Sequence, residues 1–330
     1  MLALPDRAAI EDAARLVHAA MPATPQYAWP QLAQALGTEV WVKHENHTPV
    51  GAFKVRGGLV YFDGLMHGSN PPAGVIGATR GNHGQSMAFA ARRLGLRCVV
   101  VVPRRNSLEK NAAMRALGAE LIEHGDDFQE AREHAARLAQ EQRLHYVPSF
   151  HADLVRGVAT CWAEFFDAVP DLDLVYVPIG QGSGINACVA ARNVYAPQTR
   201  IVGVVCAHAR CYALSFAAAR VIEAPVATQL ADGLACRVPD EDSLAIIRAQ
   251  VTRIVEVSDA EVAEAMRLLF SATHNVAEGA GAAALAAAQQ ESAQLAGRRI
   301  GVTLSGGNVD TDLFARVLAG ERFEPLRAVA

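Results

Sequence analysis

Lys54 stands at the start of an apolar helical segment, directly after the loop Thr48-Pro49-Val50-Gly51. Proline and glycine hold the entering backbone in a loop, so we expect the lysine amine at the mouth of a helix. The positive end of a helix and partial burial both lower the pKa of an amine towards the free base that a nucleophile or general base needs. A lysine placed in this way can form a Schiff base with an aldehyde. Most lysines in proteins are simply exposed to solvent, so the interpretation depends on what accompanies Lys54.

Three glycine-rich turns favour the chemical interpretation, because each follows an expected strand and precedes an expected helix. They are Thr79-Arg80-Gly81-Asn82-His83-Gly84, Ile179-Gly180-Gln181-Gly182-Ser183-Gly184 and Ser305-Gly306-Gly307-Asn308. Open α/β sheets bind ligands at the carboxyl ends of their strands, where free N–H groups at helix starts bind anions. Any one turn could be an ordinary βα loop. Together they predict one cleft that contains a phosphate cradle, an asparagine, a serine and the reactive lysine.

The elements that position these residues alternate between apolar strands and helices, with a less regular stretch at 215–239. The segment 97–103 is a continuous apolar strand of the kind that parallel sheets bury. The alternation predicts parallel βαβ units rather than an antiparallel meander. The expected strands are 39–43, 75–78, 97–103, 119–123, 174–178, 201–205, 253–257 and 299–304. The expected helices are 7–20, one from 30, one after Lys54, 85–94, 107–117, 126–142, 154–169, one ending at 195, 259–273, one after 278 and one near 310.

The composition indicates a globular protein with a small-molecule ligand. A chain of 330 residues that is 51% hydrophobic can bury one large domain or two interleaved ones. The net charge of −4, without a cluster of Lys and Arg, argues against nucleic-acid binding. No charged leader precedes an apolar run and no stretch of about 18 apolar residues occurs, so we expect a cytoplasmic protein without membrane association.

The cysteines predict neither disulfides nor a zinc site. None of them forms a C-x-x-C pair, and most lie in apolar strand or helix patterns, where reduced thiols behave as small hydrophobic groups. The six residues are Cys98, Cys161, Cys188, Cys206, Cys211 and Cys236.

Two other classes of protein fit the chain less well. The second turn departs from a dinucleotide-binding fingerprint, and the next strand ends in Val204-Val205-Cys206-Ala207 without the acidic residue that would bind a ribose. A nicotinamide oxidoreductase is therefore disfavoured. A non-catalytic binding protein with the same fold would be expected to lose Lys54, which is present.

The motifs resemble those of the fold type II pyridoxal-phosphate enzymes, most of all the threonine/serine dehydratase, serine racemase and hydroxyectoine-utilisation dehydratase group. The resemblance covers nearly the whole chain. It implies an α/β, tryptophan-synthase-β-like fold with two parallel-sheet domains, in which a small domain (51–151) is inserted into a large one (1–50 and 152–330). It also implies pyridoxal 5'-phosphate as cofactor and an amino-acid substrate, and family members commonly form homodimers. The motifs, in family order, are 51–57, 81–85, 180–184, 231–233, 278–281 and 305–308.

The resemblance further implies roles for individual residues. Lys54 would hold the cofactor aldehyde and act as the catalytic base. Ser305 would meet the pyridine nitrogen, and a neutral hydroxyl there limits carbanion delocalisation and favours prompt loss of a β-leaving group. The remaining cofactor contacts would come from Phe53 on the ring, Asn82 on the ring hydroxyl, and the amides of Gly180, Gln181, Gly182, Ser183 and Gly184 on the phosphate. The substrate carboxylate would be held at a helix start by the loop of Thr79, Arg80, Gly81 and His83.

Two departures from the family pattern bear on activity. Family members that bind a divalent cation place acidic ligands just beyond the strand that here ends in Val205, whereas this chain has Cys206, Ala207, His208 and Cys211. These are not ligands for a hard cation, so we expect no divalent metal requirement and no metal ligand. Arg80 occupies the position where racemases carry a serine that protonates the substrate. Arginine stays charged and cannot be that acid, so we expect little racemase activity.

The expected reaction is dehydration and deamination of a 3-hydroxy L-amino acid to a 2-keto acid and ammonia. Threonine and serine rank first, 3-phenylserine second and 3-hydroxyaspartate third, the last because Arg80 could pair with a second carboxylate. β-Replacement and racemisation are the alternatives within the fold. The side-chain pocket is expected around 48–51, 150–152 and 231–233. Only 22 residues follow Asn308, so we expect no added regulatory domain.

Overall fold

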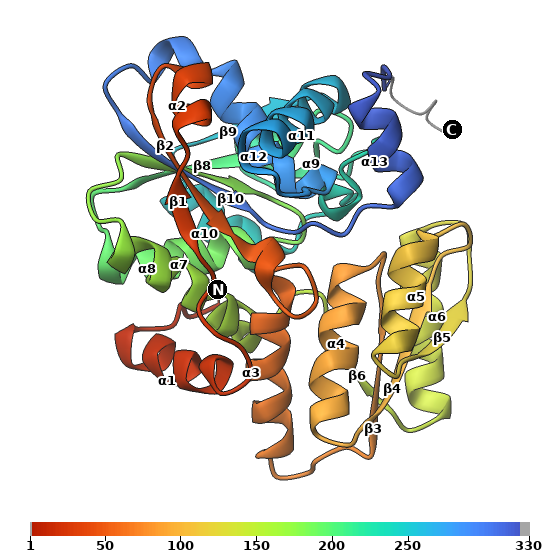
Figure 1. The fold of residues 1–330 in the computed structure, drawn as a ribbon. Helices are drawn as coiled ribbons and strands as arrows, with labels where there is room; N and C mark the ends of the chain where they lie inside the picture. Colours follow the sequence, from red (N-terminus) through yellow and green to blue (C-terminus); the bar gives the residue numbers. More distant parts are fainter. Residues whose placement is uncertain (1, 324–330) are drawn as a thin grey trace.

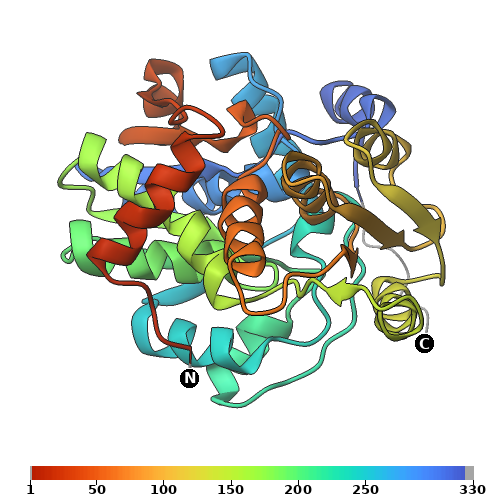
Figure 2. The ribbon, with the colours of Figure 1, turned by 90° about the horizontal axis from the view of Figure 1, so that it is seen from below.

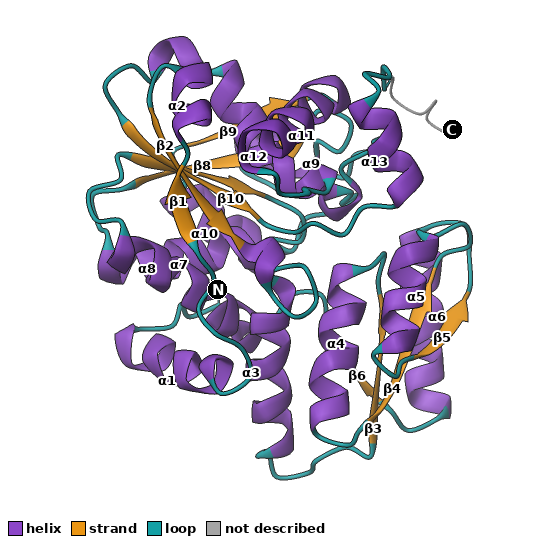
Figure 3. Cartoon of the chain, in the orientation of Figure 1, coloured by secondary structure: helices purple, strands orange, loops and turns teal. Residues whose placement is uncertain are grey.

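The computed structural model describes residues 2–323, which form two β-sheets with helices packed against their faces (Figures 1 and 3). The larger sheet has six strands, and all neighbours in it are parallel except the first pair, β1 with β2. Its strands, in order across the sheet, are β1 (Gln26–Ala28), β2 (Glu39–His44), β10 (Arg299–Leu304), β7 (Leu174–Pro178), β8 (Arg200–Cys206) and β9 (Arg253–Val257).

The smaller sheet has four strands, all parallel, and stands to one side of the larger sheet in both ribbon views (Figures 1 and 2). Its centre is the apolar run of β4, in which Cys98 to Val102 are all buried. All four strands fall within 51–151, although the boundaries of the two domains remain a prediction. The strands, in order, are β5 (Glu120–Glu123), β4 (Arg97–Val102), β3 (Gly74–Ala78) and β6 (His145–Tyr146).

Helices cover both faces of each sheet, as the alternating sequence predicts. One face of the small sheet packs on α3, α4 and α5, and the other face on α6. One face of the large sheet packs on α2, α11 and the alanine-rich α12, and the other on α7, α8 and α10. The helices of the first half are α1 (Arg7–His18), α2 (Pro30–Leu36), α3 (Lys54–Met66), α4 (Asn82–Arg93), α5 (Leu108–Ala116) and α6 (Phe128–Glu141). Those of the second half are α7 (Ala152–Ala168), α8 (Ser183–Tyr195), α9 (Cys211–Ala218), α10 (Glu241–Gln250), α11 (Asp259–Thr273), α12 (Gly279–Gln290) and α13 (Thr311–Leu318).

The fold class and all the expected strands are confirmed, but two strands and two α-helices of the described residues were not predicted from the sequence. Strands β1 and β6 are three and two residues long, too short to show a periodic pattern. Helix α9 overlaps the stretch that looked irregular, and α10 begins behind Asp240, whose carboxylate accepts a hydrogen bond from the Ser243 N–H. None of the described helices is long and apolar enough to cross a membrane.

Helix α3, which begins at Lys54, is fixed by close packing and by buried charges. A methyl group on Gly157 of α7 would lie 2.3 Å from the Arg56 carbonyl oxygen, so glycine lets the two backbones touch. The guanidinium of Arg56 donates to Glu45 at 2.7 Å and to Glu164 at 2.6 Å, and Lys43 donates to Glu164 at 2.7 Å. Burial raises the pKa of Glu164, but its hydrogen bonds and charge interactions with Arg56 and Lys43 outweigh this and lower the pKa to about 2. The Glu164 carboxylate therefore stays charged, and its bonds to Arg56, together with those of Glu45, anchor the first turn of α3.

Candidate active site

One cavity lies at the carboxyl ends of β3, β7 and β10, and it is lined by all the residues predicted to contact the cofactor or the substrate carboxylate. The loop after β3, the glycine turn after β7 and the serine turn after β10 all contribute to its wall. The expected residues that line it are Phe53, Lys54, Thr79, Arg80, Gly81, Asn82, His83, Gly180, Gln181, Gly182, Ser183, Gly184 and Ser305.

A short pairing of two backbones brings the lysine and the serine turn together. Ala52 and Gly306 form an antiparallel bridge, the Phe53 N–H donates to the Ser305 carbonyl at 3.0 Å, and the Gly307 N–H donates to the Gly51 carbonyl at 2.9 Å. Gly51 has a positive φ of 67°, which supports glycine at this turn. Lys54 thereby enters α3 directly beside the turn that carries Ser305.

The amine of Lys54 lies inside the cavity without an acidic partner. Its Nζ donates to Ser183 Oγ at 2.9 Å and sits 5.1 Å from the centre of the Phe53 ring. No carboxylate of the described residues forms an ion pair with it, and burial lowers its pKa to about 8. The chain has two other lysines, Lys43 and Lys110, and each of them is paired with a carboxylate. Lys54 is thus the lysine that can lose its proton near neutral pH.

The glycine turn after β7 leads into α8 with a backbone that is suited to hold an anion. Gly182 caps the helix with a φ of 100°, a conformation that residues with a side chain rarely adopt. A methyl group on Gly180 would lie 2.4 Å from the Gly233 carbonyl oxygen, so the turn must be bare of side chains there. Tyr212 supports the loop from behind, because its hydroxyl donates to the Gln181 carbonyl at 3.1 Å. The first N–H groups of a helix have no partner within it and bind phosphate well.

The loop before α4 offers fewer free amides than the sequence analysis assumed. The Thr79 N–H already donates to the Val101 carbonyl at 3.0 Å, and the Gly81 N–H donates to Thr79 Oγ1 at 2.9 Å. A carboxylate would therefore meet the amides of Arg80, Asn82 and His83 at the helix start. Burial, followed by the charge of Lys54, lowers the pKa of His83 to about 3, so this imidazole is neutral and is no general acid.

Arg80 reaches the same cavity and brings an unpaired cation to it. Its side chain is half-buried, and its Nε is buried without a hydrogen-bond partner in the described part of the chain. No carboxylate of the described residues forms a salt bridge with its guanidinium, in contrast to Arg56. A buried donor without a partner is costly, so this geometry is suited to an anionic ligand.

A polar network that the sequence analysis did not predict joins the two sheets across the cavity. Lys110 of α5 donates to Asp232 at 2.6 Å and to Glu278 at 3.1 Å, and Asn82 donates to Glu278 at 2.5 Å. The Asn82 side-chain oxygen accepts from Asn308 at 2.8 Å. Burial raises the pKa of Glu278; for Lys110, burial is outweighed by the charges of Asp232 and Glu278, which raise its pKa. The Asn82 side-chain amide has a second proton that could bond a ring hydroxyl. The role expected for Asn82 is compatible with this geometry and stays a prediction.

The expected side-chain pocket is only partly correct. Asp232 and Gly233 line the cavity, but the loop 48–51 and the segment 150–152 do not. Thr48 is turned inward to bond the Ala52 backbone, and the His151 side chain caps α7 by accepting from the Asp153 N–H. Side chains that the sequence analysis missed supply the wall instead, namely Phe128, Ser149, Val158, Trp162, Leu234, Ala235 and Cys236.

Comparisons with known proteins agree with this geometry. The sequence profile of the family "Pyridoxal-phosphate dependent enzyme" matches residues 18–306. The chain is 31% identical over 293 residues to L-threonine ammonia-lyase of Thermotoga maritima, covering 87% of this chain and 71% of that one. It is 32% identical over 302 residues to L-threo-3-hydroxyaspartate ammonia-lyase of a Pseudomonas species, covering 90% and 93%. Among solved structures, maize serine racemase superposes with a TM-score of 0.87 at 25% identity, covering 96% and 98%. The chain spans 62% of the length of the biosynthetic L-threonine dehydratase of Escherichia coli.

The pKa of Lys54 gives a testable pH dependence. In ligand-free protein, labelling of Lys54 by a small amine-reactive ester should rise through a midpoint near pH 8, because burial lowers its pKa to about 8 and only the free amine reacts. Lys110 should stay unreactive to higher pH, since its carboxylate partners raise its pKa. Mass spectrometry of the labelled peptides measures both. A midpoint for Lys54 at the ordinary lysine pKa of 10.5 would contradict the claim that this amine is buried without a carboxylate partner.

Proposed function

The chain belongs to the family of pyridoxal-phosphate dependent enzymes, and on that premise we propose that it eliminates the hydroxyl and amino groups of a 3-hydroxy L-amino acid. Threonine and serine are the proposed substrates, and the products are a 2-keto acid and ammonia. The observation that carries the proposal is the free amine of Lys54, which lies in one cavity with a phosphate cradle and a neutral serine turn.

The residues of the cavity fit the cofactor. The bare turn 180–184 at the start of α8 accepts a phosphate, because the backbone at Gly180 and Gly182 leaves no room for side chains. Lys54 would carry the aldehyde, Phe53 would lie against the ring, and Asn82 and Ser305 would meet the ring hydroxyl and nitrogen. Bound there, pyridoxal phosphate withdraws electrons from the substrate and weakens the bonds at its α-carbon.

The chain's own residues then supply positioning and proton transfer. The amides of Arg80, Asn82 and His83 at the start of α4 would orient the substrate carboxylate. The amine of Lys54, with a pKa of about 8, can take the α-proton near neutral pH. The hydroxyl of Ser183, 2.9 Å from that amine, lies on the turn that would hold the phosphate, so a proton has a short route to the departing hydroxyl.

Ser305 supports elimination over chemistry that needs a long-lived carbanion. Its hydroxyl faces the Ala280 carbonyl at 3.4 Å, and it would leave a pyridine nitrogen largely unprotonated. Racemisation, the activity named for the maize relative, requires an acid on the opposite face of the substrate. Arg80, which occupies that position by resemblance, stays charged and cannot donate a proton. β-Replacement remains the second alternative, and it differs by consuming a second nucleophile.

Arg80 supports a second candidate substrate, 3-hydroxyaspartate. Its unpaired guanidinium in the cavity could bind a second carboxylate through two hydrogen bonds. The relative from Pseudomonas that is matched over 93% of its length carries a 3-hydroxyaspartate activity in its name. The apolar wall of Phe128, Val158 and Trp162 would instead suit a 3-phenylserine side chain, which keeps that substrate as a third choice.

Product analysis tests the proposed reaction. Purified enzyme given threonine or serine should release a 2-keto acid and ammonia in equal amounts, measured by coupled assays. Lys54→Ala and Lys54→Arg should both lose activity by about 10²–10⁴-fold or more, because neither offers a free amine for proton transfer. Accumulation of the D-amino acid without keto acid, or full turnover by Lys54→Ala, would refute the proposal.

Comparison of substrates tests the role of Arg80. If it binds a second carboxylate, Arg80→Ala should lower kcat/KM for 3-hydroxyaspartate by about 10–100-fold and spare threonine, since a hydrogen bond to a charged group contributes about 1.5–3 kcal/mol. Arg92→Ala, which changes an exposed arginine in the last turn of α4, is the matched control. An equal loss on every substrate would show that Arg80 serves the shared carboxylate or the cofactor, and would remove support for the dicarboxylate.

A further inference from the structure

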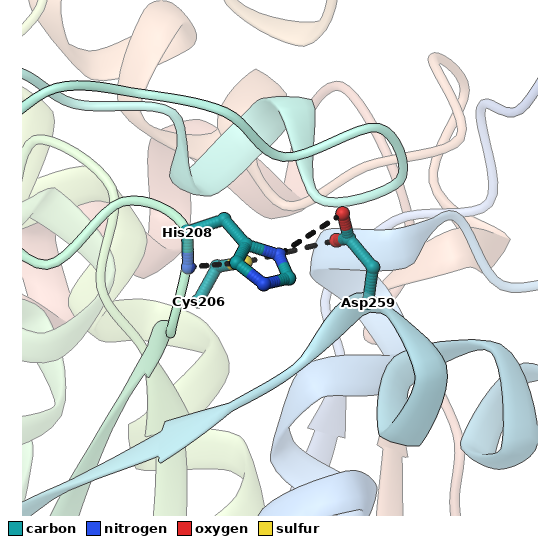
Figure 4. Close-up of side chains that lie close together, drawn as sticks. All are labelled: Cys206, His208 and Asp259. Atoms are coloured by element: carbon teal, nitrogen blue, oxygen red, sulfur yellow. Dashed lines mark hydrogen bonds and ion pairs between the residues drawn. The ribbon is translucent and has the colours of Figure 1, made fainter. Parts of the chain in front are cut away.

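Three side chains with metal-binding atoms meet where β8 ends and α11 begins (Figure 4). Cys206 is the last residue of β8, His208 follows it in the next loop, and Asp259 is the first residue of α11. One ligand atom of each residue lies within 4.8 Å of the others. None of the three lines the cavity around Lys54, so this cluster is a separate feature of the fold.

Two distances from the Asp259 carboxylate, one to each of its oxygens, are close to those around a tetrahedral zinc ion. Zinc bonds of about 2.3 Å to sulfur and about 2.0 Å to nitrogen and oxygen place neighbouring ligands roughly 3.5 Å apart for a sulfur–oxygen pair and roughly 3.3 Å for a nitrogen–oxygen pair. Here Cys206 Sγ lies 3.7 Å from Asp259 Oδ1, and His208 Nδ1 lies 3.3 Å from Asp259 Oδ2. All three ligand atoms lie within 4.8 Å of one another, so the side chains would have to move closer together to bind an ion.

Neighbouring residues hold these three side chains in place, and one side of the cluster is accessible to solvent. Thr228 Oγ1 donates to Asp259 Oδ1 at 2.6 Å, and the Gln229 N–H donates to Oδ2 at 2.8 Å. These hydrogen bonds fix the carboxylate, as hydrogen bonds to the ligands do in metal sites. The His208 N–H donates to Cys206 Sγ at 3.4 Å. Cys206 and Asp259 are buried, whereas the His208 side chain is 19% exposed. An ion could enter past His208 and keep a water as its fourth ligand.

We propose that Cys206, His208 and Asp259 bind one Zn²⁺ or a similar thiophilic divalent ion. One sulfur, one imidazole nitrogen and one carboxylate oxygen suit zinc and cobalt, and they do not suit Mg²⁺ or Ca²⁺, which require oxygen ligands. On binding, the Cys206 thiol releases its proton to solvent, and the His208 imidazole stays neutral with its proton on Nε2. Zinc is not oxidised or reduced in this step.

The site would act as a structural clamp behind the active-site wall. Asp259 holds Thr228 and Gln229, and the chain runs from there to Asp232 and Gly233, which line the cavity. The proposal departs from the expectation of no zinc site, because the sequence shows only a Cys-x-His pair. Asp259 stands 53 residues from Cys206 along the chain and is brought to it by the pairing of β8 with β9.

Titration of the holoenzyme with metal ions tests the proposal. Chelator-treated protein should bind about one equivalent of Co²⁺, with visible ligand-field absorption typical of a tetrahedral site, and Zn²⁺ should displace it. Cys206→Ser and His208→Asn should each weaken binding by at least about a hundredfold, since loss of a residue that only hydrogen-bonds to a metal ligand already costs ~10–100-fold. Cys98→Ser, a buried cysteine of the small sheet, is the matched control and should bind as the parent does.

Two results would overturn the proposal. One is a parent enzyme that binds no stoichiometric Co²⁺ or Zn²⁺. The other is unchanged binding in the His208→Asn variant, which would place the ion elsewhere, for example at the stacked rings of His124 and His134. The partly exposed His208 can be changed without altering the core, so this variant decides the question even if Cys206→Ser fails to fold.

Discussion

The amine of Lys54 forms no ion pair with a carboxylate of the described residues, because the acidic side chains that line its cavity pair with Arg56 and Lys110 instead. Burial of an unpaired ammonium costs free energy, so the neutral form is favoured and the pKa falls to about 8. Lys43 and Lys110 are also buried, but carboxylates partner both, and those of Lys110 raise its pKa. The chain thus keeps one inner lysine free for chemistry, and the cofactor and proton-transfer roles proposed for it depend on that difference.

The rest of the fold holds this amine in one position. The buried charges of Arg56, Glu45 and Glu164 anchor the first turn of α3 from below, while the bridge between Ala52 and Gly306 ties its entry to the serine turn. On the opposite side, Lys110 reaches from the small sheet to Asp232 and Glu278. Lys54, the turn 180–184 and the loop 79–83 are therefore held by elements of both sheets, and polar contacts across the cavity set their spacing.

The sequence was sufficient for the parts of the site that depend on local patterns. Gly180 to Gly184 and Ser305 could be found from the sequence because they follow apolar strands in glycine-rich turns. Neighbouring residues there predict both the backbone conformation of the turn and its position between a strand and a helix. Partners that are far apart along the chain leave no such pattern. The bonds of Lys110 to Glu278 and of Cys206 to Asp259 join residues that only the packed fold brings together. Very short strands such as β1 likewise depend on a neighbour, β2, rather than on their own sequence.

Chemical trapping of the cofactor on the protein tests the central role of Lys54 most directly. Borohydride reduction of the holoenzyme fixes pyridoxal phosphate to the amine that carries it, and peptide mass spectrometry then locates the added mass. With three lysines in the chain, each on a separate stretch of sequence, the assignment is unambiguous. The structure predicts that the cofactor is found on Lys54 alone. Its recovery on Lys43 or Lys110, or on no lysine at all, would contradict the account.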